Sequence, residues 1–123
     1  MKAILIDVKN EEVREVEHDD TRKEIYNFVE CSTFDVLRLD GVNGIYVDDE
    51  GLFVEDQLFF TYHGDNYSQT LGGNGLILGV DSEGNNISPT ITVKEVEEAI
   101  DFHPTGFDTW QWEQVKDKYL MNL

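Results

Sequence analysis

Short runs of apolar, β-branched residues alternate with polar turns over most of the 123-residue chain. This pattern predicts strands, which are short, rich in Val, Ile and aromatic residues, and bounded by Gly, Asn and Asp clusters. Residues 3–8 form the first such run, and residues 76–80 form the clearest one, which we predict to be a central strand. We predict further strands at residues 13–16, 33–39, 45–47, 52–54 and 87–91.

Two predicted helices begin with the same capping pattern, a Thr followed three residues later by a Glu. These pairs are Thr21 with Glu24 and Thr92 with Glu95. Apolar residues then recur at helical spacing and are expected to face the core: Ile25, Phe28 and Val29 in the first helix, and Val96, Ala99 and Ile100 in the second. We expect the second helix to end at His103-Pro104. A third helix is expected over residues 108–120.

Polar clusters between these elements predict turns and loops. Asn43-Gly44 favours a turn with positive φ, and residues 48–51 favour the tight turn of a hairpin. Residues 58–62 fit either a strand or an apolar loop. Residues 63–75 are rich in Gly, Asn and Ser and predict a long loop.

The order of these elements predicts an α+β fold with a mostly antiparallel sheet of about five to six strands and two to three helices. The length fits a single domain over residues 1–123. Within it we expect an α+β core at residues 1–103 and a C-terminal helical extension at residues 104–123.

Acidic residues strongly outnumber basic ones, with 26 Asp and Glu against 9 Lys and Arg and a net charge of −17. Between Leu39 and Val93 the chain has no Lys or Arg at all. Summed charge of one sign determines the long-range field of a domain, and this field repels nucleic-acid backbones and anionic membranes. We therefore expect no direct contact with nucleic acid or membrane, and a partner protein with a basic surface.

Cys31 is the only cysteine, which fits a reducing compartment because one thiol cannot form an internal disulfide. No apolar run reaches the ~18–20 residues of a membrane span. The N-terminus is too short in apolar residues for a signal peptide. These features predict a cytoplasmic protein, and they leave its oligomeric state open.

Three patterns resemble chemical sites without matching one. The acidic turn at residues 48–51 lacks the alternating ligands of a calcium loop, so a solvated hairpin tip is the better interpretation. The glycines at residues 72–75 match neither nucleotide-binding pattern, and no Lys or Arg is near them. His63 with Asp65 could be an oriented general base, but no nucleophile has a diagnostic spacing. We expect no catalysis, no metal and no cofactor.

The chain resembles a known family in several short motifs. These are the opening Lys2-Ala3-Ile4-Leu5-Ile6-Asp7, the segment at residues 44–52, the segment at residues 75–81 with Glu83-Gly84, and a capped helix with Glu95, Glu97 and Glu98. They are similar to a small family found mainly in phages, plasmids and other mobile elements, which is known only as a domain of unknown function. The resemblance spans about the first 100 residues and implies a genomic context but no site residues.

Charge and resemblance together favour a non-catalytic acidic protein of phage or plasmid origin. It would inhibit a host nucleic-acid-processing or defence complex by presenting carboxylates where the target binds phosphates. The expected contact residues are Asp48, Asp49, Glu50, Glu55, Asp56 and Asp65, with Trp110 as an apolar anchor.

Two alternatives remain open at this point. The chain could bind and sequester a nucleotide signal, with the ligand held by Tyr62, His63, Tyr67, Gly72, Gly73 and Asn74. It could also be an accessory protein whose acidity serves only solubility.

Overall fold

The computed structural model describes residues 1–50, 57–64 and 67–103, and in this part of the chain the fold is α+β. A six-stranded sheet has the order β2-β1-β7-β4-β3, with β8 beside β7, and a three-stranded sheet has the order β6-β5-β9. All strand pairs are antiparallel. The large sheet comprises β1 (Lys2–Asp7), β2 (Glu12–Glu17), β3 (Phe34–Arg38), β4 (Asn43–Asp48), β7 (Gly75–Val80) and β8 (Asn86–Ile87). The small sheet comprises β5 (Phe59–His63), β6 (Ser68–Gly72) and β9 (Ile100–His103).

The two described helices are α1 (Arg22–Val29) and α2 (Val93–Ala99), and both begin where the capping pattern predicts. Thr21 accepts a hydrogen bond from the backbone of Glu24 at the start of α1. Thr92 and Glu95 form the complete reciprocal box at the start of α2. Both caps satisfy backbone N–H groups that have no partner inside the helix.

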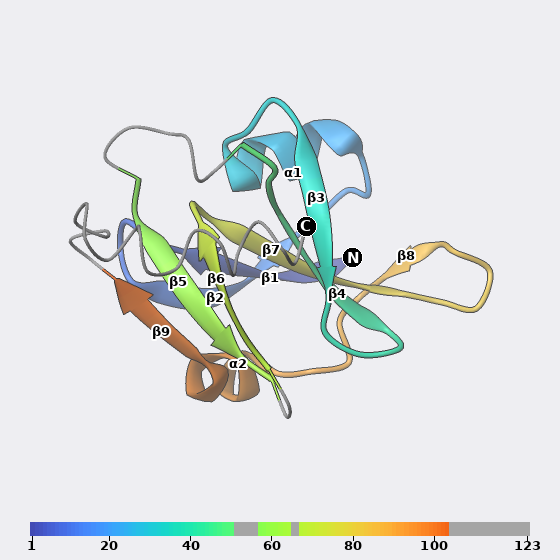
Figure 1. Cartoon of the computed structure of the whole chain (residues 1–123). Helices are drawn as coiled ribbons and strands as arrows, with labels where there is room; N and C mark the ends of the chain where they lie inside the picture. The colour runs from blue at the N-terminus through green and yellow to red at the C-terminus, as the bar shows by residue number, and fades with distance from the viewer. Residues whose placement is uncertain (51–56, 65–66, 104–123) are drawn as a thin grey trace.

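The helix α1 lies on one face of the large sheet, and the small sheet with α2 lies on the other (Figure 1). Each face has a hydrophobic cluster, because successive side chains of a strand point in opposite directions. On one face Leu5 and Leu76 pack with Ile25 and Val29 of α1. The opposite face packs against the small sheet and α2. The large sheet contributes Ile4, Ile6, Ile45 and Ile77 to this cluster, and the small sheet and α2 contribute Phe60, Leu71 and Val96. The strand at the centre of the sheet is β7, as its apolar sequence predicts.

The prediction of one sheet is corrected to two, mainly because two strands were missed. Residues 68–72 form β6 within the predicted loop, with Gln69 and Leu71 facing inward. The second helix ends at Ala99 and not at His103-Pro104, because Ile100 to His103 form β9, which pairs with β5. The ambiguous segment at residues 58–62 is mostly strand, since β5 begins at Phe59.

Asn43-Gly44 was also predicted wrongly, because it is not a turn with positive φ but the beginning of β4. The Asn43 side chain is fully buried and joins the preceding turn to the segment before α2. Its amide donates to Asp40 Oδ2 at 2.9 Å and to Thr90 Oγ1 at 2.8 Å, and its Oδ1 accepts from the Thr90 backbone at 3.0 Å. The predicted strand at residues 52–54 and the C-terminal helix lie outside the described residues.

Candidate functional site

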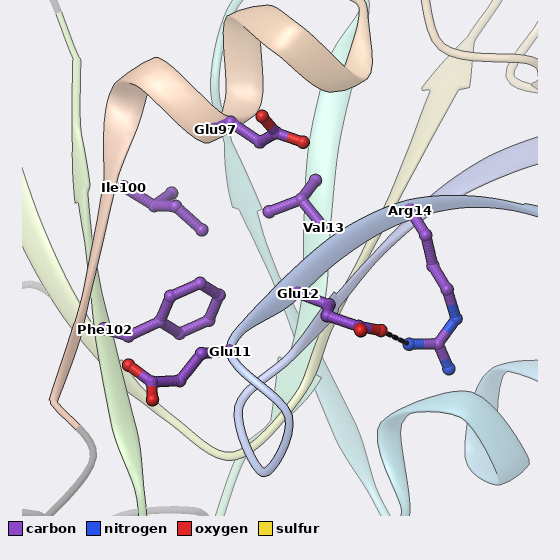
Figure 2. Close-up of a pocket in the computed structure, with 7 residues that line it drawn as sticks. All are labelled: Glu11, Glu12, Val13, Arg14, Glu97, Ile100 and Phe102. Carbon is purple, nitrogen blue, oxygen red and sulfur yellow. Dashed lines mark hydrogen bonds and ion pairs between the residues drawn. The ribbon is translucent and has the colours of Figure 1, made fainter.

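An open groove of about 530 Å³ lies between the edge strand β2 and the α2–β9 segment (Figure 2). Val13 and Phe102 are half-buried in it, and Ile100 is buried beneath them. Figure 2 shows Ile100 and Phe102 between the carboxylates of Glu97 and Glu11. The groove therefore has an apolar floor and an acidic rim, and Glu12 and Arg14 complete its lining.

The groove brings together residues that are far apart in the sequence. Glu11 lies in the turn between β1 and β2, where it adopts a positive φ of 52°. Glu97 lies on the exposed side of α2, and the helix packs against β2. No motif joins these residues, so the sequence analysis had no signal by which to find the groove.

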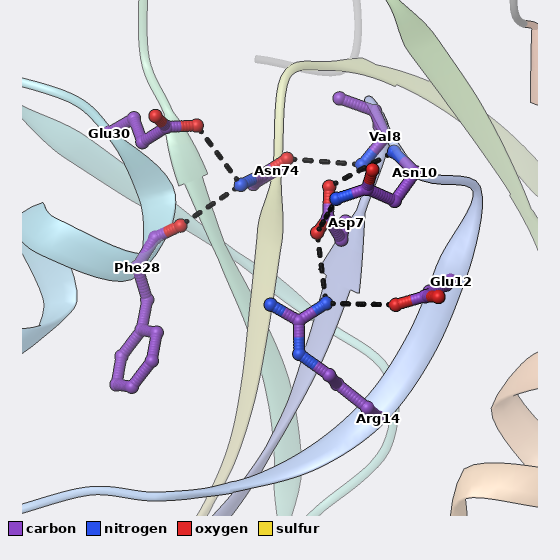
Figure 3. Close-up of polar contacts among 8 residues, drawn as sticks. All are labelled: Asp7, Val8, Asn10, Glu12, Arg14, Phe28, Glu30 and Asn74. Carbon is purple, nitrogen blue, oxygen red and sulfur yellow. Dashed lines mark hydrogen bonds and ion pairs between the residues drawn. The ribbon is translucent and has the colours of Figure 1, made fainter.

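Arg14 is the basic residue among the described residues that line the groove, and two carboxylates bind it (Figure 3). Its Nη1 donates to Asp7 Oδ2 at 2.9 Å and to Glu12 Oε2 at 3.3 Å. Burial by itself raises the pKa of Asp7, but hydrogen bonds from Arg14 and Asn10 outweigh burial and lower the pKa below the ordinary value. The positive charge of Arg14 is thus already balanced, and the groove keeps a net negative charge.

The same corner of the fold is fixed by Asn74, which follows Gly73 in the turn between β6 and β7 (Figure 3). Asn74 is buried, and its Oδ1 accepts from the Val8 backbone at 3.1 Å. Its amide donates to the Phe28 carbonyl at 3.1 Å and to Glu30 Oε2 at 3.3 Å. Asn74 therefore links the end of β1 to the end of α1, and it positions the turn that leads into Glu11.

The outer edge of β2 has unpaired backbone groups in the part of the chain that the structure describes. Met1 and His18 exchange two backbone hydrogen bonds of 2.8 and 2.7 Å, which makes them a hydrogen-bonded pair of the β1–β2 ladder. Since antiparallel pairs alternate, the N–H and C=O groups of Val13, Glu15 and Glu17 point away from β1. An exposed edge of this kind can pair with an added strand.

The predicted contact residues that the structure describes lie at the other edge of the large sheet. Asp48 is opposite Phe34 of β3, and β3 is the edge strand farthest from β2 in the sheet order. Asp48 accepts from the Glu50 backbone at 2.9 Å, and Asp49 accepts from the Thr33 hydroxyl. Glu50 is exposed. Glu55, Asp56, Asp65 and Trp110 lie outside the described residues.

Several carboxylates of the region without Lys or Arg stabilise turns locally. Asp40 accepts from the backbones of Val42 and Asn43 at 2.7 and 2.6 Å. Asp81 accepts from the backbones of Glu83 and Asn85, both at 2.9 Å. Part of the acidity thus serves turn geometry, since a side-chain oxygen of Asp can replace a backbone acceptor.

The residues of the alternative nucleotide site lie in different parts of the described structure. Tyr62 packs toward the hydrophobic core, whereas His63 is on the opposite face of β5. Gly72 is opposite Phe59 at the other end of β5, and Asn74 is engaged in the corner described above. The ring of Tyr67 lies against Gly64.

Within residues 1–50, 57–64 and 67–103, no group of three or more His, Cys, Asp or Glu side chains could hold a metal ion. Nor do these residues include a helix with the length and apolar character needed to span a membrane.

Comparisons with known proteins give one result that bears on the whole fold. No curated protein and no solved structure matches the chain. A family model described as "Domain of unknown function (DUF3846)" matches residues 1–101, which extend from the start of β1 into β9. The match covers most of the chain, so the protein belongs to this family of unknown function.

Proposed function

We propose that this chain is an acidic protein that binds a basic segment of a partner protein in the groove between β2 and α2–β9. The observation that supports the proposal is the composition of the groove. Two carboxylates, those of Glu11 and Glu97, flank the apolar side chains of Val13, Ile100 and Phe102, and Glu12 also lines the groove but is bound to Arg14 (Figure 2). An apolar floor with a charged rim is the usual anatomy of a protein-binding site.

The edge strand favours an extended basic segment as the occupant. The side chains of β2 include Glu12, Glu15 and Glu17, so a second copy of this strand would be repelled by like charges. A strand with Lys or Arg would gain main-chain hydrogen bonds to β2 and opposite charges across the pair. Its apolar side chains would be received by the groove floor.

The net charge of −17 supports the same kind of partner, because it accelerates encounter with a basic surface. In its most specific form the proposal is that a phage or plasmid protein inhibits a host nucleic-acid-processing or defence complex. Carboxylates here would occupy a surface that otherwise binds phosphates.

The test is a binding titration with the full chain and a synthetic peptide of alternating Lys and Val, followed by fluorescence anisotropy. The groove variant changes Glu11→Gln, Glu12→Gln and Glu97→Gln together. The control variant changes Asp48→Asn, Asp49→Asn and Glu50→Gln. Each variant removes three negative charges, so the loss of long-range field is matched and only the location differs.

We expect the groove variant to weaken binding about tenfold, because each exposed ion pair contributes about 0.5 kcal/mol and about 1.4 kcal/mol corresponds to a factor of ten. The control variant should retain most of the affinity. Equal losses in both variants would show binding by diffuse charge alone. A loss confined to the control would place the contact face at the Asp48–Glu50 turn instead of the groove.

A further inference from the structure

The outward face of the small sheet has a line of three polar side chains that crosses all three strands. Phe60 and Leu71 are buried, so the alternate residues of β5 and β6 point away from the core. His63 of β5 is directly opposite Ser68 of β6, and Asp101 comes from β9 on the other side.

The imidazole of His63 is held between these two partners. Its Nδ1 is 2.8 Å from Ser68 Oγ, and its Nε2 is 2.8 Å from Asp101 Oδ2. A carboxylate only accepts hydrogen bonds, which assigns the imidazole proton to Nε2. Nδ1 is then the acceptor for the Ser68 hydroxyl. This arrangement is a nucleophile within reach of a base, and a third group orients the base.

The sequence gives little indication of this line of residues. Ser68 is five residues from His63, and Asp101 is 38 residues away. The nearest carboxylate to His63 in the sequence is Asp65, and no nucleophile has a diagnostic spacing from His63. The partners are set by the register of β5 with β6 and β9, which a single sequence does not show.

We infer that Ser68 is a reactive nucleophile and that this face accepts acyl groups from activated esters. Ser68 Oγ attacks the ester carbonyl while His63 Nδ1 takes the hydroxyl proton. The carbonyl carbon–oxygen bond to the alcohol then breaks, and the imidazolium returns the proton to the departing alkoxide. Water hydrolyses the acyl-serine by the same route, which regenerates the hydroxyl. This activity is independent of partner binding in the groove.

Exposure determines the class of ester. The side chains of His63 and Asp101 are 46% and 71% exposed, so water screens the charge that develops on the imidazole. We assign no oxyanion donors to this open face. The acceleration then comes from the base alone, which restricts the substrate to small esters with acidic alcohols as leaving groups.

The test uses p-nitrophenyl acetate with the full chain at pH 8. Nitrophenolate release gives the rate, and intact mass with peptide mapping locates the acetyl group. We expect acetylation at Ser68, and Ser68→Ala and His63→Gln should each lower the protein-dependent rate by about 100-fold, the lower end of what a general base contributes. Asp101 acts as a positioning residue, so Asp101→Asn should lower the rate and Asp101→Glu should restore part of it.

A second line on the same face supplies the controls. Thr61 Oγ1 is 2.9 Å from Thr70 Oγ1 and 2.8 Å from His103 Nε2. Thr70→Val and His103→Gln change this line but should leave acetylation of Ser68 intact.

Two outcomes would overturn the inference. One is a Ser68→Ala chain that releases nitrophenolate as fast as the unaltered protein, which would mean that an imidazole attacks the ester directly. The other is acetyl mapped to Lys, Tyr or His with none on Ser68. Mapping on the unaltered chain decides the matter even if a variant fails to fold. Unchanged peptide binding in the Ser68→Ala chain would show that the groove function is separate.

Discussion

Replacing Asn74 with alanine should lower the free energy of unfolding by about 2–4 kcal/mol, although Asn74 belongs to no strand or helix. Asn74 is 8% exposed and forms three hydrogen bonds, to the Val8 backbone, the Phe28 carbonyl and Glu30. The substitution removes all three hydrogen bonds, which join the end of β1 to the end of α1.

The three bonds do not contribute equally. The bond to the Val8 N–H is buried, so alanine leaves a donor without a partner and water cannot easily replace it. Such an orphaned group costs about 1–3 kcal/mol. The Phe28 carbonyl and the Glu30 carboxylate are partly exposed and can bind water, so together they account for about 1 kcal/mol. A domain of this length is stable by roughly 6–18 kcal/mol, so the expected loss is a substantial fraction.

The assay is urea unfolding followed by far-UV circular dichroism. The midpoint should fall while the slope m stays constant, because the surface exposed on unfolding is unchanged. Asn85→Ala is the matched control, since its amide donates only to Asp81 on the exposed surface at 3.3 Å and the expected change is within about 0.5 kcal/mol. If Asn74→Ala and Asn85→Ala lose the same small amount, Asn74 does not hold β1 to α1.

Three further outcomes follow from the charged and titratable groups. The pKa of Asp7 is lowered in the folded chain, so Asp7 contributes its full stabilisation above the ordinary carboxyl pKa of 3.8. This stabilisation is lost as the pH falls through the folded pKa. Asp7→Asn should therefore make the free energy of unfolding depend less on pH in the acid range. Burial, together with the nearby charges of Asp48 and Asp49, raises the pKa of the Cys31 thiol to about 11. At pH 8 iodoacetamide should therefore alkylate Cys31 roughly 100-fold more slowly than a cysteine of pKa 9.0. Equal alkylation rates would contradict this burial. Added salt should raise the melting temperature, since it screens repulsion among 26 acidic residues, and a flat or falling melting temperature from low to moderate salt would refute this reasoning.

The sequence predicted the elements that depend on local signals. The apolar run that became β7 and the Thr92–Glu95 box of α2 both express their structure within a few residues. The helix start at Thr21 is of the same kind. Such signals need no knowledge of what packs nearby.

The missed elements depend on tertiary contacts. The segment from Ser68 to Gly72 resembles a loop because most of its residues are polar or Gly, and β6 forms because β5 pairs with it. Asn43 begins β4 instead of a turn with positive φ, and its side chain hydrogen-bonds to Thr90, 47 residues away. The helix α2 ends before Ile100, where β9 begins, because the residues from Ile100 onward pair with β5.

The groove and the line of His63, Ser68 and Asp101 were not predicted from the sequence, for the same reason. Charge composition pointed to a basic partner, but it could not locate the groove, because Glu11 and Glu97 meet only when α2 packs against β2. A high density of carboxylates does not by itself identify a contact face, since Asp40 and Asp81 each accept hydrogen bonds within their own turns.

The position of β7 between β1 and β4 determines how the chain can be divided. The hairpin β1–β2 and the hairpin β3–β4 share no strand pairing until β7 joins them. A nascent or prematurely terminated polypeptide that stops before Gly75 would have three hairpins, β1–β2, β3–β4 and β5–β6, without the strand that joins the first two. Chaperones and proteases recognise the open edges of such hairpins. A gene truncated at that point would thus encode a fragment that does not fold into a stable domain. A second fragment that contains β7, supplied separately, could complement the first.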